Sequence, residues 1–139
     1  MPNKPLRTGA VLFAKNLDRV ATFYSVVLGL TEANRASDHI VLESPGFQLV
    51  VHRIIGEGSA AGDNPARPAR RASAAFKPVF FVPSILPLRG IAETHGGVME
   101  PADQEWSFDG VRVCDGLDPE GNVIQFREHA RPAKVTVTL

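Results

Sequence analysis

The chain has 139 residues, and its 15 Lys and Arg residues balance 15 Asp and Glu residues, so its formal net charge at pH 7 is zero. That length is enough to bury the interior of one domain, and we expect a single domain over residues 1–139. A neutral chain has no field that would attract nucleic acid or an acidic membrane surface, so neither is expected as a partner.

The single cysteine, Cys114, excludes a disulfide within the chain and a metal site built from several cysteines. Residues 1–5 lack the apolar core of a signal peptide, and no apolar run approaches the length of a membrane span. We therefore expect a cytoplasmic protein.

In the first half of the chain, residues 9–13 predict a strand and Asn16 predicts the N-cap of a helix. Apolar residues then recur at spacings of three and four, which is one face of a helix that Gly29 would end. The apolar positions are Leu17, Val20, Ala21, Tyr24, Val27 and Leu28. Residues 39–43 and 47–52 predict two further strands, with a Ser-Pro-Gly turn before the second.

The same order of elements returns 68 residues later. Residues 77–82 predict a strand, Ser84 an N-cap, and Gly96-Gly97 the end of a helix. The apolar face of this second helix would contain Leu88, Ile91, Ala92 and His95. Gly9 then corresponds to Lys77, and Gly29 corresponds to Gly97.

The later strands of the two halves correspond as well. Residues 118–121 predict a turn that leads into a strand over 122–127, and residues 111–115 predict the strand before it. This correspondence places Val50 against Gln125 and His52 against Arg127. Each half contains a strand, a helix, and two or three more strands, which indicates an α+β fold.

Composition divides the chain into two modules, over residues 7–55 and 76–130. Between them, residues 56–75 have no apolar periodicity and are rich in Gly, Pro, Ala and Arg, which is typical of a linker or a mobile flap. Residues 131–139 form a tail whose β-branched alternation favours an edge strand.

Two segments carry a resemblance to a known family: LDRVATFYSVVLGL at residues 17–30 and DPEGNVIQF at residues 118–126. Both resemble the vicinal-oxygen-chelate superfamily, which includes glyoxalase I, extradiol dioxygenases, fosfomycin-resistance enzymes and bleomycin-binding proteins. The resemblance implies two β-α-β-β-β modules that form an open barrel around a concave ligand cavity, with the helices on the convex face. It also implies a homodimer.

The resemblance further implies a divalent metal held by side chains from the first and last strands of each half. The matching positions here are Gly9, Val50, Lys77 and Gln125. None offers the imidazole or carboxylate that such sites require, so no metal is expected there and no cofactor is predicted. An alternative metal ligand is His52, which His39 and Glu43 would join if their strand face lies alongside.

With no metal expected, the sequence predicts a cavity for a small molecule. Strand alternation and the implied geometry predict a lining of Val11, Phe13, Val50, His52, Lys77, Val79, Phe81, Val123, Gln125 and Arg127, with Trp106 at the rim or packed on the sheet edge. This lining is apolar with basic groups, which suits an aromatic or amphiphilic molecule that carries an anion. The leading hypothesis is therefore a metal-independent small-molecule binding protein.

Two other hypotheses stay open. One is a lyase, isomerase or dioxygenase that uses a relocated metal, or Lys77 as an acid, base or imine-forming group. The other is a dimeric interaction module whose cavity is vestigial, in which the tail pairs strands across an interface.

Overall fold

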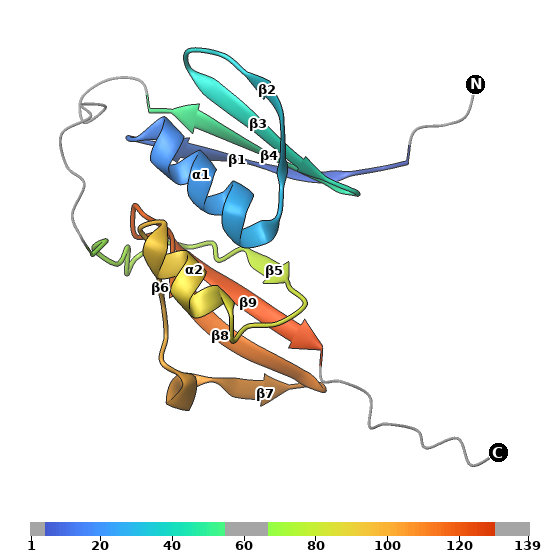
Figure 1. The fold of residues 1–139 in the computed structure, drawn as a ribbon, viewed down its shortest axis with the longest axis vertical. Coiled ribbons are helices and arrows are strands. Elements are labelled where there is room, and N and C mark those ends of the chain that lie inside the picture. The colour runs from blue at the N-terminus through green and yellow to red at the C-terminus, as the bar shows by residue number, and fades with distance from the viewer. Residues whose placement is uncertain (1–4, 55–66, 130–139) are drawn as a thin grey trace.

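Two modules make up the computed structural model, each a strand and a helix followed by further strands, and the model describes residues 5–54 and 67–129 (Figure 1). The first module contains β1 (Thr8–Ala14), α1 (Leu17–Leu28), β2 (Thr31–Arg35), β3 (His39–Ser44) and β4 (Phe47–Arg53). The second contains β5 (Val79–Phe81), α2 (Leu88–Thr94), β6 (Val98–Met99), the 3-10 turn η1 (Ala102–Gln104), β7 (Trp106–Phe108), β8 (Val111–Leu117) and β9 (Val123–His129). This is the α+β arrangement that the internal repeat predicts.

Each module forms one mixed sheet, and equivalent strands occupy equivalent places. Sheet A has the order β1-β4-β3-β2, with β1 parallel to β4 and the other pairs antiparallel. Sheet B has the order β5-β9-β8-β6, with β5 parallel to β9, and β7 pairs with β8. Strands β1 and β5 therefore each form one edge of their sheet, and both lie beside the cavity described below.

The helices α1 and α2 lie next to each other and cover one face of each sheet (Figure 1). Beneath α1 the core contains Ile40, Leu42, Leu49 and Val51 from sheet A, and beneath α2 it contains Cys114, Ile124 and Phe126 from sheet B. No helix from residues 5–54 or 67–129 covers the opposite face of each sheet, and we call it the open face. No helix among the described residues is long and apolar enough to cross a membrane.

Helix α1 begins and ends where the sequence predicts. The Asn16 side chain accepts a hydrogen bond from the Arg19 backbone N–H, and Gly29 ends the helix at φ 68° in the left-handed region. Its apolar stripe is buried, and only the end of the stripe, Leu28, is partly exposed.

Helix α2 corrects two predictions. It begins at Leu88 with Pro87 before it, so Ser84 is not its N-cap. The reason is that Leu86 precedes a proline, whose ring disfavours helical backbone at the residue before it. Ile91, expected on the buried face, is 36% exposed, whereas Leu88 and Ala92 are buried as predicted.

The second module also differs in its strands. β5 covers Val79–Phe81 rather than residues 77–82, because Pro78 has no N–H for a ladder and Lys77 lies before it. The short strands β6 and β7 had no predicted ranges. Of the predicted linker, residues 67–75 are described and contain no helix or strand, while residues 55–66 and the tail 131–139 lie outside the described residues.

The turn at residues 118–121 docks the second module onto the first. The Glu120 carboxylate accepts hydrogen bonds from the backbone N–H groups of Lys15 (2.9 Å) and Asn16 (2.7 Å), where the start of α1 favours negative charge. Gly121, at φ 82°, lies so close to Ala69 that an added Cβ would meet the Ala69 carbonyl oxygen at 1.7 Å. The turn therefore holds both α1 and the end of the segment between the modules.

Candidate functional site

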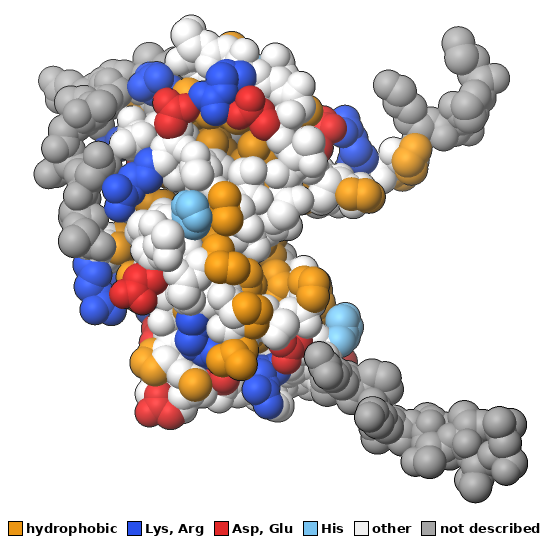
Figure 2. Space-filling view, in the orientation of Figure 1, with side chains coloured by type: hydrophobic (Ala, Val, Ile, Leu, Met, Phe, Trp, Pro, Cys, Tyr) orange, Lys and Arg blue, Asp and Glu red, His pale blue; other side chains and the backbone are white. Residues whose placement is uncertain are grey.

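An apolar cavity of about 400 Å³ lies where the edge strands β1 and β5 approach each other. Its walls come from Thr8, Gly9, Ala10, Val11, Leu12, Tyr24, Phe47, Leu49, Ala74, Phe76, Pro78, Val79, Phe80, Asn122 and Val123. Three of the predicted lining residues, Val11, Val79 and Val123, are among them. A second apolar hollow of about 300 Å³, lined by Thr8, Phe47, Val79 and Phe81 among others, opens beside the notch between the modules on the right of Figure 2.

The other predicted lining residues share the open face but lie outside the cavity wall. The register of sheet A pairs Val11 with Val50 and Phe13 with His52. The register of sheet B pairs Val79 with Gln125 and Phe81 with Arg127. Because strand side chains alternate, these eight side chains point away from the helices, and their neighbours Val51, Phe80 and Phe126 belong to or pack against the core. The predicted faces are thus the observed faces.

A row of hydrogen-bonded polar side chains crosses the open face of sheet B, and we call it the polar row. Lys77 Nζ donates to Asp115 Oδ2 at 2.9 Å, and Gln125 Nε2 donates to Asp115 Oδ1 at 3.0 Å. Arg127 Nε in turn donates to Gln125 Oε1 at 2.8 Å. Gln125 is 5% exposed, so both atoms of its amide are held between fixed neighbours. Asp115, to which the sequence analysis gave no role in the site, joins the row through the β8–β9 register.

Aromatic rings surround the outer end of the polar row. The Arg127 guanidinium carbon lies 6.0 Å from the Phe81 ring centroid and 5.6 Å from that of Phe108. Phe81 also stacks on His129 at 5.2 Å. Trp106 pairs across β7 and β8 with Val113, which is 1% exposed, while Trp106 itself is 43% exposed. Trp106 therefore lies on an edge strand of sheet B, and it is not among the residues of the cavity wall.

The four positions that would hold a metal in this fold do not fit one. Gly9 and Val50 supply no donor atom, and Lys77 already donates to Asp115. Gln125 uses its amide nitrogen on Asp115 and its amide oxygen on Arg127. A divalent ion at these positions would therefore have to displace an existing cation and break an amide hydrogen bond.

Lys77 lies in a different environment from the one that an imine-forming lysine needs. Its side chain is 41% exposed and ion-paired with Asp115, and it is not part of the cavity wall. A reactive lysine requires a dry pocket, whereas this side chain is partly exposed and bound to a carboxylate. The structure therefore gives the lysine hypothesis no support.

On sheet A, the predicted residue His52 lies beside Phe13, with 5.7 Å between their ring centroids. His39 stacks on its other side, at 5.9 Å and an interplanar angle of 7°. Asp38, which the sequence did not indicate, contacts both imidazoles. Glu43, the other residue considered beside His52, instead binds Arg7 and Gln48.

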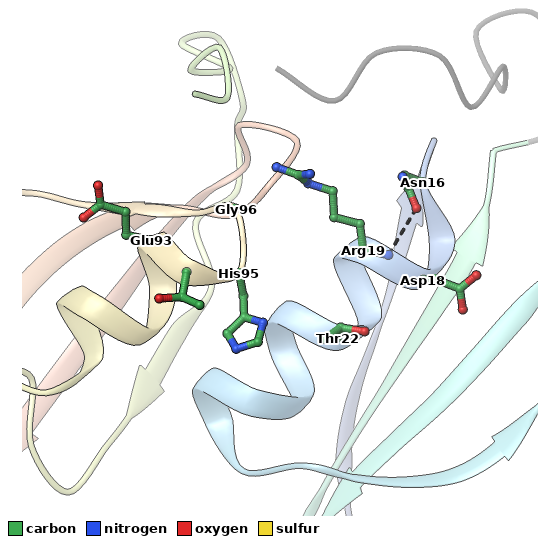
Figure 3. Close-up of a pocket in the computed structure, with 8 residues that line it drawn as sticks. Asn16, Asp18, Arg19, Thr22, Glu93, His95 and Gly96 are labelled. Atoms are coloured by element: carbon green, nitrogen blue, oxygen red, sulfur yellow. Dashed lines mark hydrogen bonds between the residues drawn. The ribbon is translucent and has the colours of Figure 1, made fainter. Parts of the chain in front are cut away.

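A wide polar groove of about 520 Å³ also runs between α1 and α2, on the side away from all of these residues (Figure 3). It contains Asp18, Arg19, Thr22, Glu93 and His95, and Figure 3 shows Arg19 extending toward the end of α2. An added Cβ at Gly96 would meet the Arg19 guanidinium at 2.6 Å, so this side chain helps to pack the helices together. The groove is open and shares no residue with the polar row.

No family model matches the sequence, and no curated protein matches it. Several solved structures are similar to the chain. A glyoxalase-related enzyme from Fulvimarina pelagi is 17% identical with a TM-score of 0.64, covering 99% of each chain. A glyoxalase/bleomycin resistance protein from Albidiferax ferrireducens T118 is 18% identical with a TM-score of 0.62, covering 90% of this chain and 98% of that one.

A bleomycin resistance determinant encoded on the transposon Tn5 is 13% identical with a TM-score of 0.58, covering 88% of this chain and 97% of that one. These likenesses show that the chain has the vicinal-oxygen-chelate fold, as the two sequence segments predict. At such low identities these structures show the fold only, and the activity must be inferred from the residues of the site.

Proposed function

We propose that this protein binds a small aromatic or amphiphilic molecule with an anionic group, and that binding needs no metal ion. The observation that carries the proposal is the environment of Arg127. Its guanidinium donates to the neutral amide of Gln125 and lies near two aromatic rings. Among the described residues no carboxylate forms an ion pair with it.

Such an arginine favours an anion beside an aromatic group. The guanidinium offers N–H donors in a planar fork that matches a carboxylate, sulfonate or phosphate. The rings of Phe81 and Phe108, each 58% exposed, offer apolar surface at the same place. Lys77 contributes less charge, because Asp115 already neutralises it.

The cavity between β1 and β5 would accept the apolar part of the ligand. Val123 belongs to the cavity wall, and Arg127 lies four residues along the same strand face. Four strand residues extend about 13 Å, so an elongated amphiphile could place its tail in the cavity and its anion at Arg127. The apolar lining with a single charged end is the usual composition of a small-molecule site.

Fluorescence of the sole tryptophan, Trp106, provides the test. Two aromatic anions, 1-anilinonaphthalene-8-sulfonate and 2-naphthoate, would be titrated into the protein. We expect saturable binding that weakens with added salt and is unchanged by EDTA. Replacing Arg127 by Gln should weaken it about tenfold or more, since a hydrogen bond to a charged group contributes about 1.5–3 kcal/mol.

Arg112 supplies the matched control, because it is an exposed arginine on the opposite face of β8. Arg112→Gln should bind both probes as the unchanged protein does. Equal affinity in the Arg127 and Arg112 variants would overturn the proposed site. Loss of binding in EDTA, restored by a divalent metal, would overturn its metal independence.

The exposed apolar side chains of the open face support a second candidate, a homodimer in which another copy covers that face. Val11, Phe13, Phe81 and Phe108 are each 56–58% exposed, which is unusual for large apolar side chains that share the open face. Light scattering of the unchanged protein should give twice the chain mass, and a double Phe13→Glu, Phe81→Glu variant should give one. Leu86→Glu, at a 75% exposed position off this face, should leave the dimer intact. A monomeric unchanged protein would rule the candidate out.

A further inference from the structure

Two histidines face each other across sheet A. His39 and His52 are direct partners in the antiparallel pair of β3 and β4, so both side chains project from the open face. Their rings stack at 5.9 Å with an interplanar angle of 7°. The backbone ladder, rather than a loop, therefore sets the distance between the two imidazoles.

A carboxylate completes the cluster. Asp38 Oδ1 lies 2.7 Å from His39 Nδ1, and Asp38 Oδ2 lies 3.7 Å from His52 Nε2. One ligand atom from each of the three residues can be chosen so that all lie within 4.8 Å of one another. Asp38 is held in place by its backbone carbonyl, which accepts the Arg53 N–H at 2.7 Å.

The hydrogen bonding of His52 prepares it as a ligand. Its Nδ1 lies 2.8 Å from the carbonyl oxygen of Arg53, which can only accept, so Nδ1 carries the proton. In the neutral form of the imidazole, which is the form that binds metal ions, the lone pair is then on Nε2, the atom that faces Asp38. A backbone carbonyl on the far nitrogen is the usual second partner of a metal-binding histidine.

From these contacts we propose that Asp38, His39 and His52 bind a divalent transition-metal ion such as Zn²⁺. Two imidazoles and one carboxylate are a common donor set for such ions, with further positions left for water or a substrate atom. The site consists of one residue each from β3 and β4 and of Asp38 just before β3, apart from the four positions that hold metal in other proteins of this fold. The proposal does not rest on the proposed function, because the polar row lies on the other sheet.

The cluster can reach metal-binding geometry with small movements. Ligand atoms about 2.0–2.2 Å from a tetrahedral ion are about 3.3 Å apart, so the present separations must change by roughly an ångström. The partly exposed side chains leave room for this, with exposures of 59% for Asp38, 30% for His39 and 25% for His52. The Phe13 ring, 5.7 Å from that of His52, provides an apolar wall on one side.

The test is calorimetric titration of Zn²⁺ into tag-free protein after EDTA treatment, with Co²⁺ as a visible-absorption probe. We expect one ion per chain with a dissociation constant of roughly 10 µM or lower at pH 7.5. Asp38→Asn, His39→Gln and His52→Gln should each weaken binding about tenfold to a hundredfold. Circular dichroism of each variant separates the loss of a ligand from the loss of the fold.

His95 and His129 supply the controls, because they lie outside the cluster. His95→Gln and His129→Gln should bind Zn²⁺ as the unchanged protein does, and so should Arg127→Gln. The proposal is overturned if the folded protein takes up no ion, or if the His39 and His52 variants bind as tightly as the controls. Long-range nitrogen NMR of the histidines gives a second readout, in which Zn²⁺ should shift Nε2 of His52 and leave His129 unchanged.

Discussion

The hydroxyl of Tyr24 donates a 2.7 Å hydrogen bond to Asp118 Oδ2, and this buried contact joins the two modules. Tyr24 comes from α1 and Asp118 from the turn between β8 and β9, and they are 2% and 0% exposed. The carboxylate also accepts hydrogen bonds from the backbone N–H groups of Glu120 and Asn122 and from the Asn122 side chain. A charge buried this deeply is tolerated because every oxygen has hydrogen-bond donors.

Replacing Tyr24 by Phe should lower the free energy of unfolding by about 1–3 kcal/mol, because a buried carboxylate oxygen loses a donor. Urea unfolding followed by circular dichroism measures this change. Thr94→Val is the control, since it removes an exposed hydroxyl that donates to the Gly90 carbonyl within α2, and it should change stability by less than about 0.5 kcal/mol. Equal costs for the two variants would contradict a special role for the Tyr24 contact.

Asp118 should make stability depend on pH in an unusual direction. Burial raises the pKa of its carboxyl above the ordinary value, although its hydrogen bonds act in the opposite sense. The folded state then holds the proton more tightly than the unfolded chain, so the contribution of Asp118 is largest below about pH 3.9, the ordinary pKa. It should fall as pH rises through the raised pKa and stay constant above it.

The measurement compares the free energy of unfolding of the unchanged protein with that of Asp118→Asn from pH 3.5 to 8, which cancels the other carboxyls. The difference between the two should be more favourable to the unchanged protein at the acid end. A difference that instead grows with rising pH would show that the hydrogen bonds outweigh burial.

Gln125→Glu should destabilise the protein rather than create a metal site. The new carboxylate would lie where the Gln125 amide now donates to Asp115 at 3.0 Å, so a hydrogen bond would become a repulsion. We expect a loss of about 1–3 kcal/mol at pH 8 that lessens as acid protonates one of the pair. Gln104→Glu, at an exposed position in η1, is the control, and a new Zn²⁺ site in the Gln125 variant would contradict this expectation.

Gly121→Ala should cost more than Gly110→Ala, although both glycines have positive φ values of 82° and 73°. At Gly110 an added Cβ meets nothing within 4 Å, so the cost is backbone strain of about 1–2 kcal/mol. At Gly121 the Cβ would meet the Ala69 carbonyl oxygen at 1.7 Å, so residues 67–71 must also move. Urea unfolding gives the difference, and faster amide exchange at Arg71, whose N–H now bonds the Gly121 carbonyl, would locate it.

Asn16→Ala and Ser84→Ala distinguish a predicted cap that the structure confirms from one that it corrects. Asn16 accepts the Arg19 N–H, and losing it should cost about 1 kcal/mol. Ser84 lies four residues before α2 and caps nothing in it, so its replacement should stay within about 0.5 kcal/mol. Thermal unfolding of both variants is the measurement, and a larger cost at Ser84 would count against the helix start at Leu88.

The features that the sequence predicts correctly are those set by local interactions. The N-cap at Asn16, the helix end at Gly29 and the alternating faces of β4 and β9 depend on backbone preferences within a few residues. The predicted start of α2 was wrong, because Pro87 disfavours helical backbone at Leu86 even though Ser84 is a good capping residue. The candidate site could be predicted less completely from the sequence, because the roles of Asp115 and Asp38 depend on partners from other strands.

Gln125 shows which features follow from the sequence and which follow only from the tertiary structure. The sequence by itself determined that an amide stands where this fold places a metal-binding carboxylate, and the repeat showed that the other three positions also lack suitable donors. The tertiary structure alone decided what that amide does, which is to connect Asp115 to Arg127, and it alone brought Asp38, His39 and His52 together. Strand register and the docking of one module on the other depend on contacts between residues far apart in the sequence. A local sequence pattern therefore does not reveal these contacts.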